Sequence, residues 1–184
     1  MDGVEDDDNT GVVVIGATNT PWVLDKGFLR RFEQRIYVPL PELQDRLDLL
    51  KILLTKNSHN LTNASLKDLA SKTRGCSCHD IKMVIKDAFR RPISKVRTAT
   101  HFRKVSTPSH KGLNVLNHNM WEPCSPNDPH AQKKSWHDLD EHETAIPLLT
   151  EHDLKESLKN IIRTVDMVDL EKLEAFDRDF GQRE

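Results

Sequence analysis

The sequence predicts an α/β segment, then a helical domain with a small β insertion, and finally a further helix. Three observations indicate this order: an early run of β-branched residues, a series of apolar stripes at helical spacing, and a proline-rich interval between two of those stripes. The chain has 184 residues, of which 36% are hydrophobic and 30% are charged. This length suits one full-sized domain or two small ones.

Two short apolar runs predict the strands of the α/β segment. Residues 12–15 are a continuous β-branched run between two glycines, which is typical of a strand covered on both faces. Residues 35–38 form a second candidate, which Pro39 and Pro41 end. Asn19 follows the first run, where α/β folds place their ligands, and its amide can orient a water or contact a terminal phosphate. The alternative is that Asn19 only forms a turn.

Five stripes of apolar residues at helical spacing predict helices. Gly75 is expected to close the second of them as a C-terminal cap, and Ser77 with Asp80 resembles a capping box at the start of the third. Thr150 is a good N-cap for the fourth, with Asp153 at its third position. The stripes cover residues 43–54, 66–73, 81–89, 154–162 and 170–180.

The interval 101–147 is rich in proline and has no sustained helical period. Short strands are expected around residues 102–105 and 135–139, so the interval is interpreted as a small β insertion. Phe102, Trp121 and Trp136 are its expected apolar anchors, because the segment has few other large side chains to bury. The alternative is a disordered insertion without a partner.

Composition excludes several classes of protein. The chain has 27 basic and 29 acidic residues, which is unlike the basic footprint of a nucleic-acid or membrane-surface binder. An odd count of three cysteines and no signal peptide favour a reducing, cytosolic compartment over a disulfide framework. Cys76, Cys78, His79 and Cys124 do not follow the ligand spacing of common structural zinc sites.

Arg30 and Arg31 are a pair of permanent cations directly before Phe32. Paired arginines can stabilise charge on a transferring phosphoryl group, and arginine fingers accelerate such transfer roughly 10³–10⁵-fold. The alternative is a solvated charge cluster. Neither this pair nor Asn19 is specific by itself.

The wider sequence resembles the second half of a AAA ATPase core. Residues 16–25 read GATNTPWVLD and residues 30–42 read RRFEQRIYVPLPE. The pattern is most similar to the vacuolar protein sorting 4 type, in the same clade as the microtubule-severing katanins and spastins. The resemblance extends from about residue 9 to the end, through residues 72–81, 92–96, 100–105, 123–129, 135–136 and 180–182.

This resemblance implies an α/β remnant of a AAA ATPase large domain, followed by a helical lid domain with a small β insertion and a C-terminal helix. By the resemblance, Asn19 occupies the sensor 1 position. Arg30 and Arg31 match the two arginine fingers that reach a neighbouring subunit's nucleotide site. The implied boundaries are 1–42 for the large-domain part, 43–100 for the lid, 101–147 for the insertion, and 148–184 for the end of the lid and the last helix.

Two features depart from the family pattern. The phosphate loop Gly-x-x-x-x-Gly-Lys-[Ser/Thr] is absent from these 184 residues, as is the Asp-Glu pair expected before Val12. The family also has Gly and Ala before Asp80, where this chain has Cys78 and His79. Gly75, Cys78 and His79 are therefore candidate nucleotide-binding positions, where the larger side chains are expected to crowd the adenine or ribose.

The resemblance implies ATP with Mg as cofactor and a homo-oligomeric ring, which is a hexamer in the family. It further implies ESCRT-III polymer disassembly in endosomal sorting, with an assembly-promoting cofactor that carries microtubule-interacting-and-transport domains bound at the β insertion. The location is expected to be cytoplasmic, with recruitment to endosomal membranes through partners and no nucleic acid bound.

Two alternatives remain open beside this function. One is a non-catalytic interaction module, because the chain without a phosphate loop is expected to be inactive alone. The other is a microtubule-severing relative, although katanin and spastin lack the β insertion.

Overall fold

The computed structural model describes residues 13–55, 57–108 and 116–181. The chain divides into two compact units, one formed by Met1–Pro39 with Val165–Glu184 and the other by Leu40–Thr164. Among the described residues, no helix combines the length and the apolar character that a bilayer crossing requires.

The first unit contains the 3-10 helix η1 (Pro21–Val23), the short helix α1 (Lys26–Arg30) and the final helix α6 (Met167–Phe180). Asp25 begins α1, because its carboxylate accepts a 2.8 Å hydrogen bond from the backbone N–H of Phe28. Helix α6 packs on η1, and the ammonium of Lys172 lies 5.3 Å from the centre of the Trp22 ring.

The two strands predicted for this unit are wrong. Residues 13–15 and 35–38 belong to no strand in the described part of the chain, and Val12 lies outside the described residues. The side chains of Ile15 and Ile36 are 87% and 83% exposed. A strand needs a neighbour that takes up its backbone N–H and C=O groups, and the only sheet among the described residues is formed by other segments.

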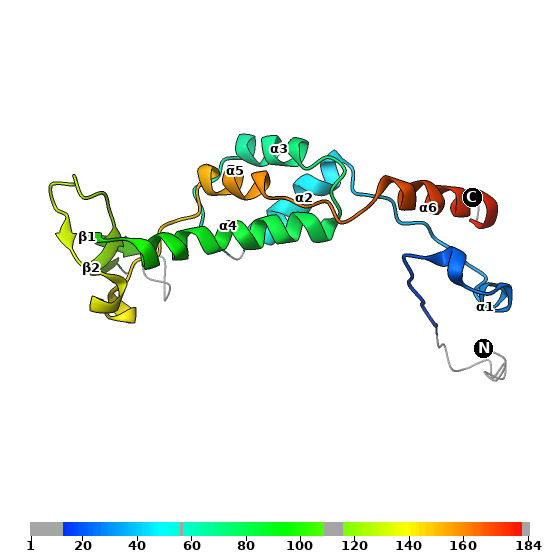
Figure 1. The fold of residues 1–184 in the computed structure, drawn as a ribbon, viewed down its shortest axis with the longest axis horizontal. Coiled ribbons are helices and arrows are strands. Elements are labelled where there is room, and N and C mark those ends of the chain that lie inside the picture. The colour runs from blue at the N-terminus through cyan, green and yellow to red at the C-terminus, as the bar shows by residue number, and fades with distance from the viewer. Residues whose placement is uncertain (1–12, 56, 109–115, 182–184) are drawn as a thin grey trace. The chain divides into compact units, whose positions relative to one another are not determined.

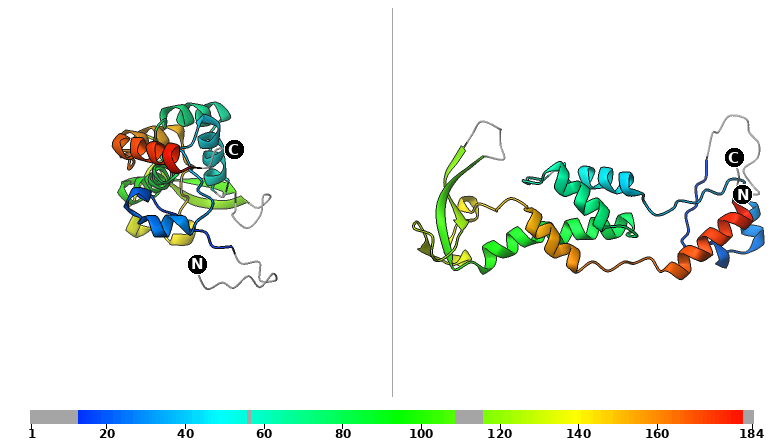
Figure 2. Two further views of the ribbon diagram at one scale, coloured as in Figure 1. Left: turned by 90° about the vertical axis from the view of Figure 1, so that its right-hand side faces the viewer. Right: turned by 90° about the horizontal axis from the view of Figure 1, so that it is seen from above.

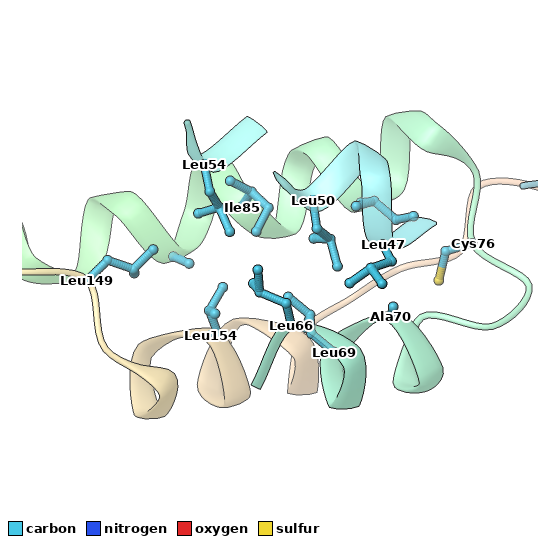
Figure 3. Packing of buried hydrophobic residues seen from close by; sticks show 12 residues of the cluster. Leu47, Leu50, Leu54, Leu66, Leu69, Ala70, Cys76, Ile85, Leu149 and Leu154 are labelled. Carbon is cyan, nitrogen blue, oxygen red and sulfur yellow. The ribbon is translucent and has the colours of Figure 1, made fainter. Parts of the chain in front are cut away.

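The second unit is built around four helices, α2 (Leu43–Leu54), α3 (Asn63–Lys72), α4 (Cys78–Thr98) and α5 (Glu151–Lys159). Their apolar side chains point toward one another and form one core (Figure 3). The predicted stripes supply most of this core, although Ile162 lies beyond α5 and is exposed. The buried members include Leu47, Leu50, Leu54, Leu66, Leu69, Ala70, Ile81, Ile85, Ala88 and Leu154.

The helix starts follow the predicted caps. Ser77 and Asp80 form a reciprocal capping box at α4, and Thr150 and Asp153 form another at α5. Helix α4 continues through the buried Pro92 to Thr98, and its buried face extends as far as Val96. A proline inside a helix removes one backbone donor, and α4 packs against α5.

The predicted β insertion forms a small antiparallel sheet at the C-terminal end of α4 (Figures 1 and 2). Its strands are β1 (His101–Pro108), β2 (Leu116–Pro123) and β3 (Gln132–Lys133), in the order β2-β1-β3. The strand predicted at 102–105 is confirmed as part of β1. The strand predicted at 135–139 is wrong, because Ser135 and Asp138 cap a short 3-10 helix, η2 (Trp136–Asp138), instead. A further 3-10 helix, η3 (Glu141–Glu143), follows.

Two of the three predicted anchors of the insertion are confirmed. Phe102 is fully buried and Trp121 is 6% exposed, and both pack with Val96 of α4. Trp136 is 37% exposed, so its prediction as an anchor is wrong. The 3-10 turn that carries Trp136 keeps its indole in part at the surface, whereas the strand pairing fixes Phe102 and Trp121 on the sheet.

Candidate functional site

The arginine pair lies at the end of α1. Arg30 is the last helical residue and Arg31 is the C-cap, whose backbone N–H bonds to the carbonyls of Phe28 and Leu29. Both arginine side chains are exposed. Phe28 precedes the arginine pair in the sequence and Phe32 follows it. Their rings lie 5.2 Å apart and contact each other across the turn. This short helix therefore presents two adjacent cations to solvent.

Asn19 lies in the segment that leads into η1, and its side chain is exposed. Beside it, the backbone N–H of Thr20 donates to the hydroxyl of Thr18 at 3.1 Å. A Cβ atom at Gly16 would lie 3.2 Å from the ring of Phe32, so the absence of a side chain at Gly16 lets the two segments approach closely. The segment before Asn19 and the turn after Arg31 are therefore neighbours within the first unit.

The lid residues predicted to face a nucleotide lie at the start of α4. Gly75 has a left-handed φ of 77°, which glycine adopts without strain. The C-cap of α3 is Thr73, and a hydrogen bond from Cys76 N to the carbonyl of Thr73 closes the turn around Gly75. Cys78 and His79 are the first two residues of α4, and both side chains are exposed.

A cation that sequence reasoning missed lies beside Gly75. The guanidinium carbon of Arg163 is 3.9 Å from the position that a Cβ atom at Gly75 would take. The start of a 21-residue helix adds positive partial charge. This corner of the lid therefore combines a cation and a helix start with the buried carboxylate of Asp80. No local pattern in the sequence pairs Arg163 with Gly75.

Asp80 fixes the geometry of this corner. Its buried carboxylate accepts hydrogen bonds from the backbone N–H of Ser77 at 2.9 Å and from the hydroxyl of Thr164 at 2.8 Å. Burial alone raises the pKa of Asp80, but the hydrogen bonds from Ser77 and Thr164 outweigh it and hold the pKa below its ordinary value. Asp80 is therefore an ionised structural group that fastens the segment next to Arg163.

The six predicted site residues fall into the two units. Asn19, Arg30 and Arg31 belong to the first, whereas Gly75, Cys78 and His79 belong to the second. The described residues contain no group of three or more His, Cys, Asp or Glu side chains that could hold a metal ion. The described part of the chain thus offers a lid corner and an arginine pair.

Two protein families match different parts of the chain. Residues 121–181 match the Vps4 C terminal oligomerisation domain. Residues 1–40 match the ATPase family associated with various cellular activities (AAA).

Curated relatives match almost the whole chain. Vacuolar protein sorting-associated protein 4B of Pongo abelii is 44% identical over 175 residues, which are 95% of this chain and 39% of the relative. Vacuolar protein sorting-associated protein 4A of Homo sapiens is 42% identical over 182 residues, which are 99% of this chain and 41% of the relative. The chain thus spans about two fifths of the length of these relatives. Spastin of Danio rerio is 45% identical over 97 residues, which are 53% of this chain and 17% of spastin.

A solved structure supports the same assignment. The FIGL-1 AAA domain in complex with ADP has a TM-score of 0.63 and 26% sequence identity, and the match covers 91% of this chain and 44% of that chain. The fold is therefore that of a AAA ATPase region. This fold, the vacuolar protein sorting 4 relatives and the two family matches agree. They show that this chain belongs to the Vps4-type AAA ATPases and corresponds to their C-terminal portion.

Proposed function

We propose that the chain is the C-terminal portion of an ATP-driven enzyme that disassembles ESCRT-III polymers in endosomal and multivesicular-body sorting. The observation that carries this proposal is the β unit between α4 and α5, which lies inside a match of 42–44% identity to vacuolar protein sorting 4 proteins. In this proposal the protein acts in the cytoplasm and reaches endosomal membranes only through its partners.

Arg30 and Arg31 are proposed to act in trans within a homo-oligomeric ring, a hexamer in the family. Both side chains are exposed at the end of α1 and lie next to each other in the sequence. At a neighbouring subunit's nucleotide site they stabilise negative charge on the transferring phosphoryl group. Asn19 is proposed to orient the attacking water as sensor 1. The match of residues 121–181 to an oligomerisation domain supports assembly.

The lid corner is proposed to contact the base and ribose of ATP. Gly75 carries no side chain that would fill the turn, and the guanidinium of Arg163 lies beside it as a hydrogen-bond donor. Cys78 and His79 project from the same place and limit the space for the ligand. Bound ATP with Mg supplies the phosphoryl group that is transferred to water.

The β unit is proposed to bind a cofactor that promotes ring assembly. Arg103 of β1 donates to Glu122 at 3.0 Å and to Asp128 at 2.9 Å, which fastens the proline-rich segment 123–129 to the sheet. A fastened segment loses little conformational entropy when a partner binds. The partly exposed Trp136 adds an amphipathic side chain of the kind enriched at protein interfaces.

Two alternatives are less well supported. The match to spastin favours a microtubule-severing role, but it covers only 53% of the chain. A non-catalytic interaction module is favoured by the absence of a phosphate-loop motif from these 184 residues.

The test uses a chimaera in which this chain replaces the matching segment of human vacuolar protein sorting-associated protein 4A, hereafter the 4A chimaera. We expect it to release subunits from sedimentable ESCRT-III polymers when ATP is added, and to leave stabilised microtubules intact. Release in the presence of ADP alone, or severing of microtubules, would contradict the proposal. An Arg30→Ala chimaera is the matched control and should release no more than the ADP sample.

A further inference from the structure

The guanidinium of Arg35 joins the C-terminal ends of two helices in the first unit. Its Nη1 donates to the carbonyl of Phe180, the last residue of α6, at 2.8 Å. Its Nη2 donates to the carbonyl of Leu29, in the last turn of α1, at 3.4 Å. The last carbonyls of a helix have no partner inside the helix and carry partial negative charge, so a planar cation suits both positions.

The carbonyl of Leu29 belongs to the turn that carries the arginine pair. The same oxygen accepts hydrogen bonds from the backbone N–H groups of Arg31 and Phe32. Helix α1 has five residues, and a helix of this length does not persist without outside support. A side chain that holds Leu29 therefore also holds the backbone on which Arg30 and Arg31 stand.

Helix α6 has further contacts with the same part of the chain. Lys172 lies over Trp22, which precedes α1. Burial raises the pKa of Tyr37, and the carboxylates of Glu174 and Asp177 on α6 raise it further. Helix α6 thus contacts Trp22 before α1 and Arg35 after it, and the guanidinium of Arg35 also bonds to α1.

We propose that Arg35 is a positioning residue that makes the placement of Arg30 and Arg31 depend on the docking of α6. The final helix then acts as a support for the arginine turn. Displacement of α6 releases the guanidinium from Phe180, and the end of α1 loses the contact that holds Leu29. The inference rests on the proposed role of Arg30 and Arg31 in trans, and it adds a residue and a helix to that role.

The first experiment uses the 184-residue chain and needs no activity. Amide hydrogen exchange is measured by rapid quench at Arg31 and Phe32 in the wild type and in Arg35→Ala. We expect about tenfold faster exchange at both amides in the variant, because one supporting hydrogen bond is lost. Arg178→Lys, a change to an exposed arginine on α6, is the matched control and should leave exchange unchanged. Equal exchange at Arg31 and Phe32 in Arg35→Ala and wild type overturns the proposal.

The second experiment uses the 4A chimaera and separates positioning from folding. Lysine keeps the charge, but its single ammonium nitrogen cannot take the places of both Nη1 and Nη2 of Arg35. We therefore expect Arg35→Lys to lower kcat about tenfold while KM for ATP stays within about twofold, with the same ring mass by light scattering. An unchanged kcat in Arg35→Lys contradicts the positioning role.

The two proposals fail in different ways. If Arg30→Ala and Arg31→Ala both leave turnover of the 4A chimaera unchanged, the role in trans is wrong. The exchange experiment still decides whether Arg35 couples α6 to α1, because it reports backbone protection and not catalysis.

Discussion

The hydroxyl of Thr164 donates a 2.8 Å hydrogen bond to the buried carboxylate of Asp80. The same carboxylate closes the capping box of α4 by accepting from the backbone N–H of Ser77. One side chain thus joins the start of α4 to the segment that follows α5, next to Gly75 and Arg163. The geometry of the lid corner depends on this ionised group.

Replacing Asp80 should lower stability in a pH-dependent way. Its folded-state pKa lies below the unfolded value of about 3.9, so the unfolded state binds more protons in acid. The contribution is therefore present above about pH 4 and is lost as the pH falls through the folded-state pKa. We expect Asp80→Asn to reduce the free energy of unfolding by about 1–3 kcal/mol at pH 7 and by less at pH 3.

Urea denaturation at the two pH values measures this difference. Asp179→Asn, at an exposed position on α6, is the control and should change stability little at either pH. An equal loss of stability for Asp80→Asn at pH 7 and pH 3 would show that the ionised form contributes nothing.

Cys78 and His79 should weaken nucleotide binding by the lid. Both side chains are exposed at the start of α4, where the family pattern has Gly and Ala. We expect Cys78→Gly with His79→Ala to tighten nucleotide binding by the 4A chimaera, as measured with a fluorescent ADP analogue. Glycine in the first turn costs at most about 1 kcal/mol of helix stability, so thermal unfolding is measured alongside. Unchanged affinity in a folded variant would mean that these positions do not crowd the ligand.

The 184-residue chain alone should not turn over ATP. Its sequence contains no phosphate-loop motif. Phosphate release at the level of a buffer blank is the expected result. Turnover above the blank that disappears in Asn19→Ala would contradict this prediction.

Trp121 and Trp136 should have opposite roles in the β unit. Trp121 is buried beside Phe102 with Lys104 and Lys134 over its ring, so Trp121→Ala should lower the free energy of unfolding by about 3–5 kcal/mol. Trp136→Ala should cost less than about 1 kcal/mol and should reduce capture of the assembly-promoting cofactor in a pull-down. Full cofactor capture by a folded Trp136→Ala protein would remove this side chain from the interface.

Local patterns predicted those parts of the fold that local energetics decide. The leucine stripe of α2 and the capping boxes at Ser77 and Thr150 were readable because their partners lie three or four residues away. The strand around Phe102 was expected because the interval 101–147 has no sustained helical period.

Long-range relationships were not predictable from these patterns. Arg35 and Phe180 are 145 residues apart, and Asp80 and Thr164 are 84 apart, so no spacing rule connects them. The strand expected at residues 35–38 failed for a related reason, because strand formation depends on a distant partner and not on the run itself. Asn19 and the arginine pair gained meaning only from the family resemblance, since a polar turn and a charge cluster have many other uses.

The central claim is that this chain completes the ATP site of a neighbouring subunit, and steady-state turnover tests it most directly. In the 4A chimaera, Arg30→Ala and Arg31→Ala should each lower kcat by about 10³-fold or more while nucleotide affinity changes little. Mixing either variant with a chimaera that retains both arginines but has an inactivated phosphate loop should restore turnover, because each partner supplies what the other lacks. Wild-type kcat in both variants, or no recovery in mixed rings of normal mass, would contradict the account.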